Sequence, residues 1–330
     1  MAAEPGDQAG SQPGGVILRD SAGSSGETHG ADYNGRVSQP GAPLGIDRHA
    51  RLYRDNDFVY PVLSRRARGI SIGINLNPDK ICNFDCIYCQ VDRTAPPVIR
   101  EVDEPKLLEE LRSALRDARS GELFRRSEFA ALPPGLRAVR DITFAGDGEP
   151  PSYPNFLGVV REVLRIKEEE EGFAGLKVIL LTNATLIDRP NVVEAMRLMD
   201  AAQGEFWLKL DAGTEEYYRL VERTTIPLAK VLANILQAAR VRPVVLQSLF
   251  MKIHGQGPGF DEIVAYCDRV GAIHAEGGRI KLVQAYTVAR PPAESYVMPL
   301  EDDELDALAE ELRRRLPEGV PVETFYSGHM

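Results

Sequence analysis

The chain has 330 residues, twice a typical domain of about 150, which fits either two domains or one large α/β fold. Its 39 lysines and arginines against 49 aspartates and glutamates give a net charge of −10, which argues against a broad basic surface for nucleic acid and leaves open only a local basic patch. No apolar run approaches the roughly 20 residues that cross a bilayer, so the composition excludes an integral membrane protein.

The first 45 residues consist mainly of glycine, proline, serine and small polar residues. Such a segment buries too little apolar surface to offset its chain entropy, so residues 1–45 are predicted to form a disordered tail. The N-terminus also lacks the basic and apolar regions of a secretory signal, and four cysteines are too few for a disulfide scaffold. These features predict a cytoplasmic protein.

From residue 46 onward, short aliphatic runs alternate with longer amphipathic ones. The predicted strands are residues 70–76, 139–144, 176–181, 206–210, 244–250 and 280–286. Between them, apolar residues at three-and-four spacing predict helices, of which the last carries Leu305, Leu308 and Leu312 and precedes a C-terminal strand. This alternation predicts one α/β domain over residues 46–330 with about six parallel β-α units, while periodicity leaves an open sheet and a barrel as alternatives.

Three of the four cysteines, Cys82, Cys86 and Cys89, fall within eight residues directly after the first predicted strand. A structural zinc site normally takes four protein ligands in two pairs, and the fourth cysteine, Cys267, lies far along the chain at an apolar helix position that predicts core packing. A [4Fe–4S] cluster ordinarily takes four thiolates, so three leave one iron open, as in a reactive site. A partial zinc site or incidental thiols are the alternatives.

The C-x3-C-x2-C spacing, with the aromatic Tyr88 before the last cysteine, resembles the radical S-adenosylmethionine (radical SAM) superfamily. The resemblance implies a partial (β/α)6 TIM-like barrel of parallel strands, with a [4Fe–4S] cluster on the three cysteines and S-adenosylmethionine as cofactors. It also implies reductive cleavage of SAM to a 5′-deoxyadenosyl radical that abstracts hydrogen from a substrate. Tyr88 would pack near the adenine, and the electron would come from a low-potential donor such as ferredoxin or flavodoxin.

The second predicted strand ends in Gly146-Asp147-Gly148-Glu149, which resembles a variant of the glycine-glycine-glutamate element of the family. The resemblance implies that Gly146, Gly148 or Glu149 contacts the amino group of the methionine part of SAM. Asn183, Lys209 and Asp211 end the next two strands, where family members often contact SAM. Each of these polar residues has a simpler alternative role, either in a tight turn or as the cap of the following helix.

Several further polar residues lie where a substrate could be bound. The candidates of the last two parallel strands and their loops are Gln247, Lys252, His254, Gln284, Tyr286 and Arg290. Arg65, Arg66 and Arg68 precede the first strand, where a basic run is usually a solvated face. The alternative is a contact to an anionic substrate or a redox partner. No residue pattern identifies a catalytic residue, a substrate, or a choice among oxidoreductase, transferase and lyase.

Across residues 61–326 the chain resembles the branch of the superfamily that is grouped with wyosine-type tRNA-modifying enzymes, on motifs such as the run from Gln284 to Pro292. The archaeal and eukaryotic wyosine synthases bind a second cluster through additional upstream cysteines, whereas no cysteine precedes Cys82 in this sequence. We therefore predict that this chain does not build a second cluster. A wyosine-like tRNA-modifying enzyme and a non-catalytic iron–sulfur protein for electron transfer or redox sensing are the alternative functions.

Overall fold

The computed structural model describes residues 53–328. The predicted tail of residues 1–45 and the predicted domain start at residue 46 therefore lie outside the described residues. Within the described part, no helix is both long and apolar enough to cross a membrane.

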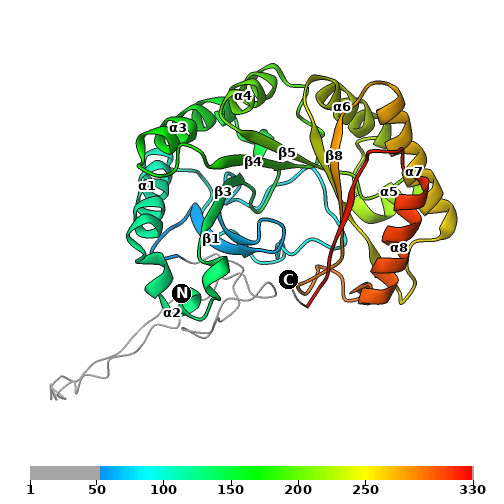
Figure 1. Cartoon of the computed structure of the whole chain (residues 1–330), viewed down its shortest axis with the longest axis horizontal. Helices are drawn as coiled ribbons and strands as arrows, with labels where there is room; N and C mark the ends of the chain where they lie inside the picture. The colour runs from blue at the N-terminus through cyan, green and yellow to red at the C-terminus, as the bar shows by residue number, and fades with distance from the viewer. Residues whose placement is uncertain (1–52, 329–330) are drawn as a thin grey trace, which may run out of the picture.

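A curled, mostly parallel sheet forms the centre of the molecule (Figure 1). Its strands are β1 (Val59–Ser64), β2 (Gly69–Ile74), β3 (Val139–Phe144), β4 (Lys177–Thr182), β5 (Gly204–Lys209), β6 (Val244–Leu249), β8 (Ile280–Tyr286) and β10 (Val322–Phe325). They are hydrogen-bonded in that order, and every pair is parallel except the antiparallel pair of β1 and β2. The short strands β7 (Met251–Ile253) and β9 (Val297–Pro299) form a separate antiparallel pair. Because β1 and β10 are the two ends of the strand order, the barrel is open between them.

Helices connect the parallel strands and form an arc outside the sheet (Figure 1). They are α1 (Glu104–Ser120), α2 (Ser127–Ala130), α3 (Phe156–Glu169), α4 (Pro190–Ala201), α5 (Glu215–Glu222), α6 (Leu228–Val241), α7 (Phe260–Ala275) and α8 (Asp302–Arg315). The first is typical, since Leu107, Leu111 and Leu115 bury one face of α1 against the sheet, and the left-handed backbone of Gly121 ends it. The main apolar core therefore lies between the sheet and the helices.

The structure confirms the predicted partial barrel of parallel strands with a C-terminal helix and strand. β3 and β8 have the predicted bounds, and the other predicted strands differ from the observed ones by one or two residues at their ends. Strand β1 was not predicted, because Pro61 weakens a strand pattern. Proline is tolerated here since β1 is an edge strand that pairs only with β2 among the described residues.

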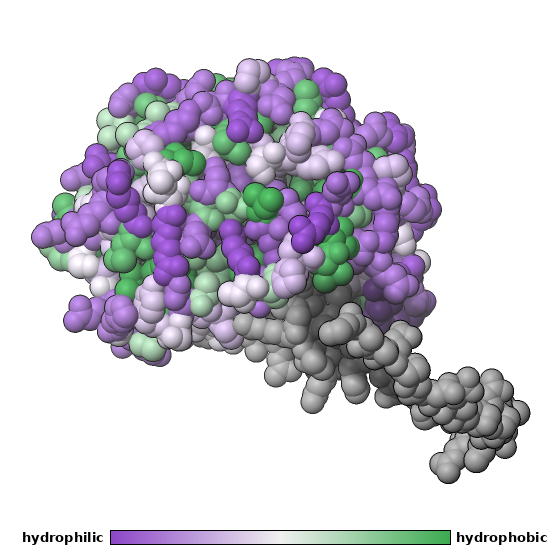
Figure 2. Space-filling model, turned by 180° about the vertical axis from the view of Figure 1, so that it is seen from behind, coloured by the Kyte–Doolittle hydropathy of each residue, from purple (hydrophilic) through white to green (hydrophobic). Residues whose placement is uncertain are grey.

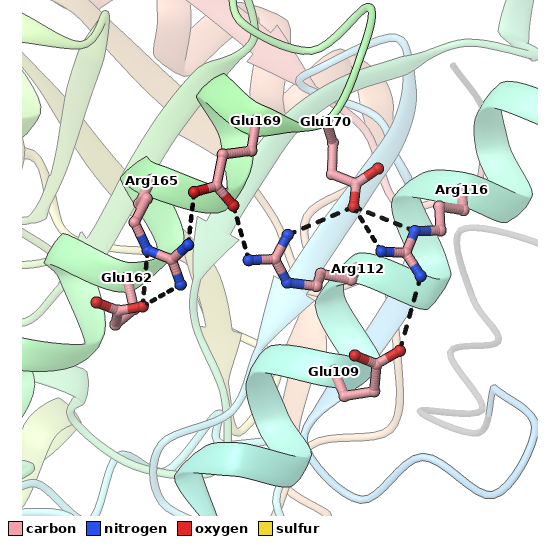
Figure 3. Close-up of polar contacts among 7 residues, drawn as sticks. All are labelled: Glu109, Arg112, Arg116, Glu162, Arg165, Glu169 and Glu170. Atoms are coloured by element: carbon pink, nitrogen blue, oxygen red, sulfur yellow. Dashed lines mark hydrogen bonds and ion pairs between the residues drawn. The ribbon is translucent and has the colours of Figure 1, made fainter.

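Ion pairs tie α1 to α3 on the outer surface (Figure 3). Arg112 of α1 lies 2.8 Å from Glu169 and 3.5 Å from Glu170, and Arg116 lies 3.1 Å from Glu170. Arg165 of α3 extends the network to Glu169 at 2.5 Å. The opposite view shows apolar side chains scattered among polar ones on that face (Figure 2). Both views are typical of a solvated outer layer.

Candidate active site

A cavity of about 310 Å³ lies inside the barrel. Its lining includes the three clustered cysteines, the glycine turn after β3, and residues at the carboxyl ends of β4, β5, β6 and β8. Among the described residues predicted to bind the cofactors, the following line it: Cys82, Cys86, Tyr88, Cys89, Gly146, Gly148, Glu149, Asn183 and Lys209. Carboxyl ends of parallel strands are where α/β folds place their ligands, so this cavity is the candidate active site.

The cysteine loop after β2 is held in place by the end of α5. The backbone amides of Asp85 and Ile87 donate to the carbonyl oxygens of Glu222 at 3.1 Å and Val221 at 2.9 Å. The Thr224 hydroxyl donates to the carbonyl of Asn83 at 3.1 Å. The loop is therefore fixed against a segment more than 130 positions away in the chain, which gives the thiols defined places in the cavity.

The thiols have three different surroundings. Cys86 donates to the Glu222 carboxyl at 2.6 Å, while the Arg93 guanidinium donates to the Cys89 sulfur at 3.6 Å. Burial raises the pKa of Cys82, and burial together with Glu222 raises the pKa of Cys86 well above its usual value. Burial opposes the charge of Arg93, but the thiols of Cys89 and Cys82 raise its pKa overall. Arg93 is therefore a permanent cation beside the sulfur atoms.

The donor set fits an iron–sulfur cluster better than a single ion. Within residues 53–328, no group of three histidine, cysteine or acidic side chains is close enough to hold one metal ion. In a cubane each cysteine binds a different iron, so the sulfur atoms need not converge on one point. Cys267 is buried in α7 within the apolar core, as predicted, and is no fourth ligand. The three thiols in one cavity would leave the fourth iron open.

The turn after β3 packs against the cysteine loop, and two glycines make the approach possible. A Cβ atom at Gly148 would lie 2.1 Å from the carbonyl oxygen of Ile81, and one at Gly146 would lie 2.2 Å from the Asn75 side chain. Asp147 is fully buried, and its carboxylate accepts a hydrogen bond from Asn75 at 2.8 Å. The aspartate between the glycines therefore holds this turn to the end of β2.

Glu149 links this turn to the end of β4. Its carboxylate accepts hydrogen bonds from the Thr182 hydroxyl and, at 2.9 Å, from the backbone amide of Asn183. Burial raises the pKa of Glu149 to about 7. The Asn183 side chain in turn donates to Asn83 of the cysteine loop at 2.7 Å. Glu149 and Asn183, which are predicted to bind the cofactors, therefore both line the cavity. Their side chains also connect the turn after β3, the end of β4 and the cysteine loop.

A buried polar network lies beneath the cysteines. Lys209 donates to the Tyr88 hydroxyl, lies 4.3 Å from the centre of the Tyr88 ring and is 3.4 Å from Asp211. The Asp211 carboxylate accepts from Tyr88 at 2.5 Å and from the Leu249 amide at 2.7 Å. Glu222 accepts from Tyr88 at 3.2 Å. The Tyr88 ring is therefore packed against a lysine, and Asp211 lies behind Lys209 and Tyr88 without lining the cavity.

Protonation in this network follows from burial and neighbours. Burial lowers the pKa of Lys209, but Asp211 and other nearby groups raise it overall, so the ammonium stays charged. Burial, followed by the charge of Asp211, raises the pKa of Glu222. Burial also raises the pKa of Tyr88, so its hydroxyl stays a neutral donor. Lys209 is therefore a second charged group of the cavity near the thiols, in addition to Arg93.

The remaining candidates divide into two groups. Gln247, Tyr286 and Arg290 line the cavity, and Gln284 is buried beside Gln247. Lys252 and His254 do not line it, because Lys252 pairs with Glu304 on α8 and His254 stacks on Tyr296. Three further residues of the site, Asn75, Arg93 and Glu222, were not predicted from the sequence. Only Arg93, four positions after Cys89, had a signal, namely a charge next to the cysteine run.

The fold and the cavity thus define an α/β partial barrel with three thiols at the carboxyl ends of its strands. A family model described as the radical SAM superfamily matches residues 76–267, which is more than half of the chain. The chain belongs to the radical SAM superfamily and is a radical SAM enzyme, which confirms the prediction made from the cysteine spacing.

Curated relatives are distant. A protein of Helicobacter pylori strain J99 called "UPF0026 protein" is 27% identical over 248 residues, covering 74% of this chain and 70% of the relative. A "UPF0026 protein" of Methanocaldococcus jannaschii is 29% identical over 180 residues, covering 53% of this chain and 47% of the relative. A Brachyspira hyodysenteriae protein called "GTPase Obg" is 23% identical over 254 residues, and only 32% of it is covered. For the last two, the chain spans half or less of the relative.

Two similar solved structures are described as TYW1. The crystal structure of archaeal TYW1 is 15% identical with a TM-score of 0.45, and the match covers 80% of this chain and 85% of that one. The structure of TYW1 with a lysine-pyruvate adduct bound is 16% identical with a TM-score of 0.46, covering 80% and 86%.

Proposed function

We propose that the chain binds a [4Fe–4S] cluster through Cys82, Cys86 and Cys89 and reductively cleaves S-adenosylmethionine. The observation that carries this proposal is that three thiols, a glycine turn and a buried lysine line one cavity of a radical SAM fold. When bound, the cluster and SAM would supply a 5′-deoxyadenosyl radical that abstracts hydrogen from a substrate.

The residues of the chain would bind and orient these cofactors. The backbone from Gly146 to Gly148, brought close to the cysteine loop, would present polar groups to the methionine part of SAM. The charged Lys209 and the amide of Asn183 would donate to the SAM carboxylate or ribose. Tyr88 would hold Lys209 in position, and Asp211 would keep it charged.

Arg93 would compensate the negative charge of the thiolates, because its guanidinium donates to the Cys89 sulfur. The cluster would take its electron from a low-potential donor such as ferredoxin or flavodoxin. A cytoplasmic location fits such a donor. The same cavity gives no specific support to the tRNA-modifying alternative.

The test is anaerobic reconstitution with iron and sulfide, followed by dithionite reduction in the presence of SAM and an assay for 5′-deoxyadenosine. The wild type is expected to turn brown and to form 5′-deoxyadenosine, and Cys86→Ala is expected to lose both. Cys267→Ala is the matched control, since this buried cysteine lies in the core of α7 and should leave both readouts in place.

The other results are equally informative. A brown wild type that never cleaves SAM would favour the iron–sulfur electron-transfer alternative. A colourless protein that holds zinc, or a Cys86→Ala variant that still forms the cluster, would overturn the proposal.

A further inference from the structure

Two arginines of the turn between β1 and β2 reach the interior of the barrel. Ser64 and Gly69 pair across this turn, so the turn lies at the amino-terminal end of β2. The cysteine loop follows the opposite, carboxyl-terminal end of the same strand. Arg65 donates to the carbonyl of Phe325 on β10 at 3.4 Å, which joins the two open edges of the barrel. Arg65 and Arg66 both line the cavity. The run predicted to be a solvated face is therefore partly inside the barrel.

The Arg66 guanidinium lies between aromatic rings. Its central carbon is 4.9 Å from the ring centre of Tyr286 and 5.5 Å from that of Trp207. Trp207 is two residues before Lys209 on β5, whereas Tyr286 is two residues beyond Gln284, which lies level with Lys209 in the sheet. The guanidinium therefore contacts rings on both sides of the Lys209 level inside the barrel.

Arg66 has a hydrogen-bonding capacity that the described residues do not use. Its Nη1 atom is buried and has no hydrogen-bond partner among them. A buried donor without an acceptor costs free energy, and more so when it is charged. Such an atom, facing a cavity, is suited to a ligand that brings its own acceptor.

No carboxylate within residues 53–328 forms an ion pair with Arg65 or Arg66. Asp141 attracts Arg66 at longer range, but its carboxylate already accepts from the hydroxyls of Ser71 and Thr143. Burial lowers the pKa of Arg66, and burial followed by repulsion from Arg66 lowers the pKa of Arg65 to about 10. An anion bound here would relieve both the repulsion and the missing acceptor.

We propose that Arg66, with Arg65 beside it, binds the anionic group of the substrate, which is a small molecule bearing a carboxylate or a phosphate. This assignment rests on the proposed function, because SAM and the cluster would take the cysteine end of the same cavity. The uncharged part of the substrate would then extend from Arg66 toward Lys209 and the glycine turn. The substrate would share this cavity of about 310 Å³ with SAM and the cluster, so only a small substrate fits.

The chain contains a built-in probe of this site. Trp207 is its single tryptophan, and the Arg66 guanidinium lies over its ring. Titration of the full-length, cluster-free chain with inorganic phosphate and, separately, with acetate should change the tryptophan fluorescence in a saturable way. Neither SAM nor a cluster is needed, so a failure to cleave SAM leaves this measurement intact.

Three variants make the test specific. Arg66→Gln should weaken the anion affinity at least about tenfold, because a charged hydrogen-bond donor is lost. Arg66→Lys should retain part of it. Arg68→Gln removes the same charge from an exposed residue of the same turn and should bind the anion as the wild type does. Circular dichroism of each variant reports whether it is folded.

Saturation by phosphate, by acetate or by both supports the proposal. The probe that saturates shows whether the site accepts a phosphate, a carboxylate or either. Absence of a saturable response to either in the folded wild type would overturn it, as would an unchanged affinity in folded Arg66→Gln or an equal loss in Arg68→Gln. Equilibrium dialysis of SAM with the reconstituted protein separates the two ligands. If Arg66→Gln loses SAM affinity as strongly as anion affinity, the anion is the carboxylate of SAM, and the substrate assignment is wrong.

Discussion

The charged pairs on the outside of α1 and α3 and those inside the barrel differ in how far water reaches them. Arg165 and Glu169 on the outer surface lie 2.5 Å apart with side chains 50% and 44% exposed. Lys209 and Asp211 inside the barrel lie 3.4 Å apart with side chains 19% and 0% exposed. Water therefore solvates the outer pair in both the folded and the unfolded chain, but solvates both members of the inner pair only when the chain unfolds.

This difference in solvation helps to distinguish charged groups of the surface from charged groups that serve a site. An exposed pair gains little, because water and salt screen it. A buried pair must offset a large desolvation cost, so removal of one partner strongly destabilises the fold by leaving a buried charge unpaired. Replacement of both partners by apolar residues often leaves the stability unchanged. A cluster of buried charges in a cavity therefore indicates a site that needs them. The predictions below test whether the two regions differ as much as burial implies.

The largest effect is expected for Asp211→Ala. The substitution leaves Lys209 without its ion-pair carboxylate and removes the nearer acceptor of the Tyr88 hydroxyl and the acceptor of the Leu249 amide. Loss of one partner of a buried pair costs about 3–5 kcal/mol. Urea unfolding of the cluster-free chain should show a decrease of this size in the free energy of unfolding.

The matched control is Asp200→Ala on α4, whose carboxylate pairs with Arg242 at 2.8 Å and is one-third exposed. Its free energy of unfolding should decrease by about 1 kcal/mol or less. Equal losses in the two variants would show that the interior network is no more costly to break than a surface pair.

The next effect concerns the pH dependence of stability at Glu149. Burial raises its pKa from 4.5 to about 7 in the folded chain, so between these values the folded state keeps a proton that the unfolded state releases. Stability should therefore fall as the pH rises through this window, by about 3 kcal/mol in total, and be unaffected by this group below it. Glu149→Gln cannot ionise and should remove this part of the slope.

The measurement is urea unfolding of the cluster-free chain at a series of pH values from 4.5 to 7.5. Glu169→Gln is the control, because this exposed carboxylate has a lowered pKa and cannot produce the same slope. The interpretation is wrong if the slope of Glu149→Gln equals that of the wild type.

Local patterns of the sequence predicted the fold and the cysteines because both are encoded locally. The segment Val139–Phe144 is rich in β-branched and aromatic residues and is a strand through its own composition, and the spacing of Cys82, Cys86 and Cys89 is a property of one loop. Long-range contacts were not predictable in this way. Glu222 is one acidic residue on an amphipathic helix, and only the folded chain brings it to the Cys86 thiol.

Arg66 shows the same limit, and so does Glu170. Arg66 belongs to a basic run predicted to be a solvated face, yet it lines the cavity. Glu170 follows α3 in an acidic run, yet it is 8% exposed and lies between two arginines of α1. The side of a turn or helix end that faces the interior depends on neighbours far away in the chain. Sequence periodicity carries no information about such neighbours.

The smallest effect is expected for Arg112→Gln in the outer network. Arg112 joins α1 to both Glu169 and Glu170, with a side chain that is 19% exposed (Figure 3). The free energy of unfolding should decrease by about 0.5–1 kcal/mol at low salt, and the difference should shrink as the salt concentration rises. A double-mutant cycle with Glu169→Gln, whose carboxylate is 44% exposed, isolates the exposed pair itself. If the coupling is large and independent of salt, the outer pairs behave like the buried network, and burial alone does not explain the contrast between the two regions.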